Sequence, residues 1–126
     1  MMKLSFWMGV KAIVETFFGL GFVLVPAVVV AMFGGPLSPA AATFVRLGGA
    51  VFLAGAIILW RSRFEPPVGP IMRSIVLAAV ISNGIGLFAT LWAVLSGGWN
   101  VLGWSGVVFN LAFFVAFGYN LLVKPA

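Results

Sequence analysis

Residues 71–95 read IMRSIVLAAVISNGIGLFATLWAVL, and Arg73 is the only charged residue in this stretch. An apolar run of about 20 residues is long enough to cross the ~30 Å hydrocarbon core of a bilayer as a helix. The run stops at Ser96-Gly97-Gly98, where consecutive glycines interrupt helical structure. The stretch therefore predicts one membrane-spanning helix.

Three further apolar runs surround this stretch, at about residues 6–33, 40–60 and 101–123. The Gly34–Pro39 connector separates the first two, because Gly and Pro together interrupt a helix. The connector from Phe64 to Pro70 is rich in proline, and we expect it to be extended. The four runs predict an all-α protein, in which one domain of residues 1–126 forms an up-down bundle of four transmembrane helices.

The composition excludes a soluble domain and most catalytic chemistries. Of the 126 residues, 63% are hydrophobic and 7% are charged, whereas a soluble domain is about 45–50% apolar and about 25% charged. Histidine, cysteine and aspartate are absent, and Glu15 and Glu65 are the only acidic residues. These absences exclude thiolate nucleophiles, histidine bases, disulfides, zinc sites and iron–sulfur clusters. We expect no catalytic residue of these kinds, no metal and no cofactor, and whether the protein is an enzyme stays open.

The basic residues predict how the four helices are oriented. The net charge is +5, and all Lys and Arg residues except Arg46 flank the apolar runs: Lys3, Lys11, Arg61, Arg63, Arg73 and Lys124. The connectors 34–39 and 96–100 carry none. Since Lys and Arg favour the cytoplasmic side, we expect both termini and the central loop to be cytoplasmic, with the chain in a bacterial cytoplasmic (inner) membrane. Cations at helix ends indicate contact with the lipid bilayer rather than binding of nucleic acid.

A stripe of small and polar residues recurs at helical spacing along the third and fourth runs. In the third run it consists of Ala79, Asn83, Gly86, Thr90, Ala93 and Gly97, and in the fourth it begins with Gly103, Gly106 and Asn110. Small residues let helix backbones approach one another in lipid, so the stripe indicates helix packing. Asn83 and Asn110 both lie near the middle of their runs. We expect a hydrogen bond between these interhelical polar residues, worth about 0.6–1.7 kcal/mol in a membrane.

Arg46 is the only cation well inside an apolar run. By helical rise it lies roughly 9 Å from the outer end of that run, at the level of Pro26, Thr90 and Ser105. Pro26 has no N–H to donate to the carbonyl of Phe22, which is therefore free to accept a hydrogen bond from Arg46. Two interpretations stay open. Arg46 reaches lipid phosphate beside this carbonyl, or Arg46 and the three residues at its level form an outward-opening site for an anion or polar head group.

Glu15 is the second polar feature, and we expect it near the cytoplasmic end of the first run, at the level of Lys11, Arg73 and Tyr119. About 18 Å of depth separates it from Arg46, so we expect no salt bridge between these two residues. An ion pair with Lys11 or Arg73 is one interpretation, because Lys11 precedes Glu15 by four residues on a helix. The other is a protonatable carboxyl group on a proton or ion path, which intramembrane carboxylates often mark.

Four short motifs are spread along the chain: Glu15-x-x-x-Gly19-Leu20 before Pro26, Phe44-x-Arg46-Leu47-Gly48-x-Ala50, Gly55 through Trp60-Arg61-x-Arg63, and Asn83-x-x-Gly86. Together they resemble the DoxX-like class of small four-helix bacterial membrane proteins, most of them uncharacterised. The resemblance implies a four-helix bundle that associates, as a few members do, with quinone-linked redox enzymes as a small subunit. Glu15 is also similar to the essential first-helix glutamate of small multidrug resistance transporters, although those form antiparallel dimers with weak charge bias.

These residues lead to three functional hypotheses. In the first, the protein is a non-enzymatic accessory or binding subunit, and Arg46 holds the polar or anionic head of a lipid, quinone or similar small molecule. In the alternative, it is a proton-coupled small-molecule transporter that uses Glu15. In the third, its role is purely structural. A homo-oligomer and a membrane enzyme complex are both open as assemblies.

Overall fold

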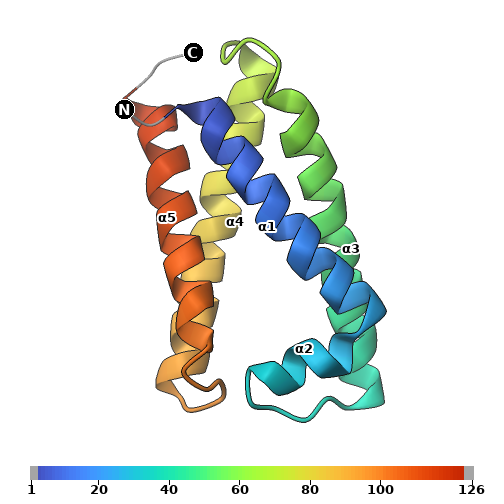
Figure 1. Cartoon of the computed structure of the whole chain (residues 1–126). Coiled ribbons are helices and arrows are strands. Elements are labelled where there is room, and N and C mark those ends of the chain that lie inside the picture. The colour runs from blue at the N-terminus through green and yellow to red at the C-terminus, as the bar shows by residue number, and fades with distance from the viewer. Residues whose placement is uncertain (1–2, 124–126) are drawn as a thin grey trace.

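The computed structural model describes residues 3–123, which form five helices and no strand. The helices are α1 (Leu4–Leu24), α2 (Pro26–Met32), α3 (Pro39–Ser62), α4 (Pro70–Leu95) and α5 (Gly103–Leu122). All but α2 are long and apolar enough to cross a membrane, which confirms the all-α fold with four membrane-capable helices (Figure 1). Lys124, which contributed to the orientation prediction, lies outside the described residues.

The expected first span of residues 6–33 is wrong, because two helices occupy it. The α1 helix ends at Leu24, and Val25 leaves the helical conformation with φ −137° and ψ 57°. Pro26 then begins α2. Proline disfavours the continuation of a helix, since it lacks an N–H and its ring clashes with the preceding turn, but it is well suited to the first position of a new one. The short α2 helix consequently lies across the lower end of the molecule instead of extending α1 (Figure 1).

The four long helices are arranged as two hairpins. The α1 helix packs along α3, and α4 packs along α5, whereas α3 has no extended contact with α4 or α5. The hairpins meet where α1 packs against α5, for example where the rings of Trp7 and Phe113 lie 6.3 Å apart. We call the end at which α1 and α4 begin the terminal end, and the opposite one the α2 end. From the terminal end the hairpins diverge toward the α2 end (Figure 1).

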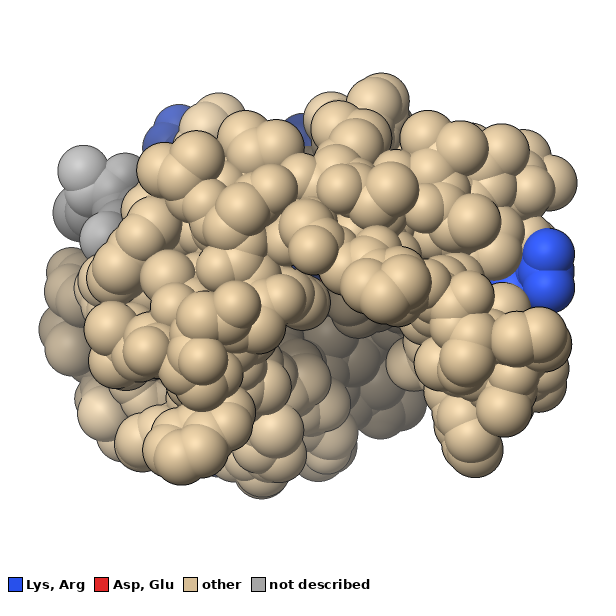
Figure 2. Space-filling view, turned by 90° about the horizontal axis from the view of Figure 1, so that it is seen from below, with Lys and Arg blue, Asp and Glu red and all other residues tan. Residues whose placement is uncertain are grey.

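The hydrophobic core lies in the half of the bundle nearer the terminal end. Its buried members come from all four long helices: Leu4, Met8, Ala12, Ala56, Leu59, Met72, Val76, Ala79, Phe113 and Phe117. At the α2 end the hairpins are joined differently. The backbone N–H and side-chain amide of Asn100 donate to the carbonyls of Phe33 and Met32, each at 2.9 Å. Figure 2 shows this end, which is hollowed between the hairpins and presents no acidic side chain.

Glycines allow close helix crossings in both hairpins, and the small-residue stripe predicts those of the second. In the first hairpin, a Cβ on Gly49 would lie 2.8 Å from the carbonyl oxygen of Gly19, so the α1 and α3 backbones touch there. In the second hairpin, Gly86 lies against the side chain of Asn110, and Gly106 against that of Thr90. Small residues at these positions let helices approach in lipid, where apolar side chains alone give little preference for one neighbour.

Candidate functional site

The most buried charges in the described chain are Lys11 and Glu15, on α1. Lys11 Nζ lies 2.6 Å from Glu15 Oε1, and the two side chains are 9% and 12% exposed. This confirms the expected ion pair with Lys11. Its depth differs from the expectation, because α1 ends at Leu24 and Glu15 is therefore close to the middle of the helix. The ion pair lies inside the bundle rather than near its end.

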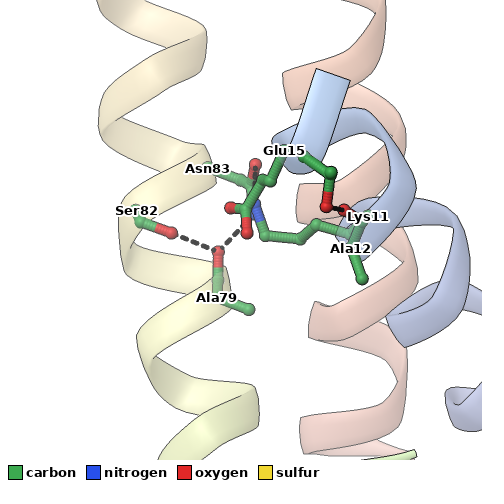
Figure 3. Close-up of polar contacts among 7 residues, drawn as sticks. Lys11, Ala12, Glu15, Ala79, Ser82 and Asn83 are labelled. Carbon is green, nitrogen blue, oxygen red and sulfur yellow. Dashed lines mark hydrogen bonds and ion pairs between the residues drawn. The ribbon is translucent and has the colours of Figure 1, made fainter. Parts of the chain in front are cut away.

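Lys11 also reaches the second hairpin. Its Nζ donates to Asn83 Oδ1 on α4 at 3.3 Å and lies over the ring of Phe113 on α5, 5.2 Å from the centroid. The Asn83 amide nitrogen donates to the carbonyl of Ala79 at 2.7 Å. Figure 3 shows Lys11, Glu15 and Asn83 gathered between α1 and α4. These three residues form the charged cluster, which joins the hairpins across the interior of the protein.

The expected hydrogen bond between Asn83 and Asn110 is wrong. Asn110 donates to the carbonyl of Gly106 on its own helix at 2.8 Å, and its side chain packs against Gly86. The oxygen of Asn83 accepts instead from Lys11. A charged ammonium is the stronger donor, since charge-assisted hydrogen bonds are roughly twice as strong as those between neutral groups.

One oxygen of the charged cluster has no partner. Glu15 Oε2 is buried and accepts no hydrogen bond from any of residues 3–123. It lies against Gly55 of α3, where a Cβ would come within 2.9 Å of it. An unsatisfied buried acceptor costs about 1–3 kcal/mol. Within the described residues, Glu15 thus combines a strong ion pair at one oxygen with an open acceptor position at the other.

Arg46 occupies a different environment, at the surface of the first hairpin near the α2 end. Its Nε donates to the carbonyl of Val23 at 3.3 Å. The expected acceptor was the carbonyl of Phe22, one residue earlier. The end of α1 explains the shift, because the last four carbonyls of a helix lack donors within it and the carbonyl of Val23 is one of them. Arg46 itself is exposed, whereas Pro26 is buried.

The predicted ligand-binding set is divided between the hairpins: Arg46 is on α3 and Pro26 on α2, whereas Thr90 is on α4 and Ser105 on α5. Thr90 donates to the carbonyl of Gly86 at 2.8 Å, and Ser105 to that of Leu102 at 2.6 Å, each within its own segment of the second hairpin. Arg46 is on α3, which has no extended contact with α4 or α5. Equal depth does not bring these side chains together, because the hairpins diverge toward this end.

The predicted proton or ion set is likewise reduced to two of its members. Arg73 donates from Nη1 to the carbonyl of Leu121 at 3.5 Å, and this contact joins α4 to α5 at the terminal end. Tyr119, near the end of α5, is no part of the charged cluster. Lys11 and Glu15 stay together, and Asn83 is the member that the sequence did not indicate. Counting residues from Leu4 and Pro70 at 1.5 Å per residue places Glu15 and Asn83 at similar depths, roughly 17 and 20 Å. It does not show that the two side chains face each other.

Neither a metal cluster nor a related protein assigns a chemistry to these residues. In the described part of the chain, no three His, Cys, Asp or Glu residues lie together as metal ligands. Comparisons with protein-family models, with curated proteins and with solved structures find no match. Functional proposals therefore depend on the geometry of the charged cluster and of Arg46.

Proposed function

We propose that the protein is a non-enzymatic accessory or binding subunit that holds the polar or anionic head of a lipid, quinone or similar amphiphile at Arg46. The observation that carries this proposal is the hydrogen bonding of the Arg46 guanidinium. Its Nε is held by the carbonyl of Val23, and its two terminal nitrogens have no partner among residues 3–123. A guanidinium fixed in this way presents a planar pair of donors, which suits phosphate and carboxylate oxygens.

The acidic residues leave Arg46 available for an external anion. Glu15 is paired with Lys11 inside the bundle, and Glu65 lies in the loop between α3 and α4 at the terminal end. The surroundings favour an amphiphile over a small soluble anion, because the helix that carries Arg46 exposes apolar side chains, among them Phe44 and Leu47. A lipid tail covers such side chains while its head group bonds to the cation.

Native mass spectrometry of gently extracted protein tests this proposal. We expect wild type to carry a bound molecule that Arg46→Ala loses and Arg46→Lys partly retains, since Lys cannot bond in bidentate fashion. Arg61→Ala removes one cation at the opposite end and is the matched control, which keeps the molecule. A bare wild-type mass, or a set of bound molecules that Arg46→Ala retains in full, contradicts the proposal.

We further propose that the protein is a DoxX-like protein of a bacterial cytoplasmic membrane, with both termini inside the cell. The supporting features are the quoted motifs and the clustering of Lys3, Arg61, Arg63 and Arg73 at the terminal end. Because the chain lacks cysteine, single cysteines at Ser38, Ser62 and Ser96 report the orientation. We expect Ser62→Cys to be labelled only from inside, and labelling of it from outside would reverse the orientation.

A second candidate, proton-coupled transport of a small molecule through Glu15, is favoured by the unpartnered buried Oε2. Such an oxygen can receive a proton without first losing a hydrogen bond. Vesicles that contain the purified protein, a pH gradient and a fluorescent organic cation provide the assay. Transport in wild type that Glu15→Gln abolishes would support this candidate. Equal transport by Glu15→Gln and wild type would eliminate it.

A further inference from the structure

A groove runs along the lipid-facing side of the first hairpin, away from both Arg46 and the charged cluster. It has a volume of about 270 Å³ and is lined by Ala12, Ile13, Thr16, Phe17, Leu20 and Trp60. Five of these residues recur every three or four positions along α1 and therefore share one helix face. The hydroxyl of Thr16 donates to the carbonyl of Ala12 at 2.7 Å. With that hydroxyl already bonded, the groove suits an apolar occupant.

A fixed cation lies at the terminal end of this groove. The guanidinium of Arg63 lies over the ring of Trp60, 4.7 Å from its centroid, and 5.3 Å from the ring of Phe64. It also rests on α1 at Gly9, where a Cβ would lie 2.8 Å from Cζ and Nη1. Gly9 precedes Ile13 by about one helical turn. Stacking on a tryptophan and contact with a glycine hold the guanidinium in place without using its N–H groups.

The charges around Arg63 favour an anion. Within residues 3–123, no hydrogen bond or ion pair engages its guanidinium, so its donors are available. Other basic residues at this end are Lys3, Arg61 and Arg73, against the single acidic residue Glu65. A cation of this kind binds phosphate in bidentate fashion. The adjacent apolar groove extends roughly 12 Å along α1, from Ala12 to Leu20, at 1.5 Å per residue.

We propose that Arg63 and this groove bind one anionic phospholipid, with the phosphate on the guanidinium and an acyl chain between α1 and Trp60. The site combines a cation with an apolar groove, so a matching ligand has both an anionic head and an apolar chain. A free phosphate would leave the apolar groove unfilled, and an uncharged tail would leave the donors of Arg63 unused. The site does not depend on the function proposed for Arg46, which lies toward the α2 end.

Native mass spectrometry with added lipid tests the proposal. The full chain is extracted in detergent and mixed with phosphatidylglycerol, with phosphatidylcholine or with inorganic phosphate. We expect wild type to retain one phosphatidylglycerol at collision energies that remove phosphatidylcholine, and to show no phosphate adduct. Arg63→Ala should lower the retained phosphatidylglycerol at least tenfold. Arg61→Ala removes the same charge two residues away and should lower it no more than twofold.

A second variant tests the groove independently of the cation. Ile13→Trp places a large side chain in the groove while Arg63 stays intact, and the exposure of Ile13 to lipid makes this change compatible with folding. Ile57→Trp, on the exposed face of α3, is the matched control. We expect only Ile13→Trp to reduce retention of phosphatidylglycerol, with unchanged helical circular dichroism for both variants.

Three results would overturn this assignment. Equal losses in Arg61→Ala and Arg63→Ala would show that only the summed charge matters. Equal retention of phosphatidylcholine and phosphatidylglycerol would remove the preference for an anionic lipid. A phosphate adduct that depends on Arg63 but not on the groove would show a small-anion site. Arg46→Ala should leave retention unchanged, so failure at one site is distinguishable from failure at the other.

Discussion

The interior of the bundle near the terminal end and the surface at the α2 end differ in how their charged side chains are paired. Near the terminal end, four helices surround a hydrophobic core, and Lys11 finds both of its polar partners, Glu15 and Asn83, within the chain. At the α2 end α3 has no extended contact with α4 or α5, and the terminal nitrogens of Arg46 meet no partner in residues 3–123. Removing one partner of a charge pair inside a protein destabilises the fold, whereas a charge left open at its surface is available for binding. The difference predicts which substitutions should unfold the protein and which should change only what it binds.

The largest loss of stability is expected when one partner of the buried ion pair is removed. Lys11→Ala leaves Glu15 buried without a counter-charge, and breaking such a pair costs about 3–5 kcal/mol. The free energy of unfolding in mixed micelles measures this loss. The double variant Lys11→Met, Glu15→Met should recover most of it, because apolar residues of similar volume replace a buried pair at little cost. A double variant that is as unstable as Lys11→Ala would contradict this account.

Two neighbouring glycines of α3 allow a packed position to be compared with an open one on the same helix. Gly49 touches the α1 backbone at Gly19, whereas a Cβ on its neighbour Gly48 would meet no heavy atom within 4 Å. Gly49→Val should therefore destabilise the first hairpin by about 1–3 kcal/mol through overpacking. Gly48→Val is the matched control and should change stability by less than about 0.5 kcal/mol. Thermal unfolding in the same detergent compares the two variants, and equal losses would show that the crossing is not at Gly49.

Loss of the link between the hairpins should have a smaller effect. Asn83→Ala removes the acceptor of Lys11, and polar contacts between membrane helices are worth about 0.6–1.7 kcal/mol. A double-mutant cycle of Lys11 and Asn83 isolates their coupling. Asn110→Ala serves as the control, because Asn110 bonds within its own helix. If Asn110 couples to Lys11 as strongly as Asn83 does, the assignment of the cluster is wrong.

The sequence allowed the long helices to be predicted but not the pairing of their side chains. Run length and hydropathy are properties of a segment, so α3, α4 and α5 could be placed to within a few residues. The end of α1 at Leu24 could not be predicted in the same way. Pro26 can either kink a helix or start a new one, and both outcomes are compatible with proline. The bond between Lys11 and Asn83 joins residues 72 positions apart, and it depends on which helices become neighbours. Depth alone could not show that Thr90 and Ser105 lie on a hairpin that diverges from Arg46.

The smallest effect on stability is expected at Arg46, and this prediction separates the two halves most directly. Arg46 is exposed, and within residues 3–123 its side chain makes one hydrogen bond, to the carbonyl of Val23 at 3.3 Å. Arg46→Ala should therefore change the free energy of unfolding by no more than about 0.5 kcal/mol, as at most surface positions. The same variant should lose the bound amphiphile in native mass spectrometry.

Unfolding is measured with and without added lipid, because a ligand that binds only the folded state stabilises it by mass action. Arg46→Ala should gain less stability from the added lipid than wild type does, because lipid bound at Arg63 stabilises both proteins equally. If Arg46→Ala lowers the free energy of unfolding by more than about 2 kcal/mol without lipid, Arg46 is a structural charge. The contrast between the α2 end and the interior would then be wrong.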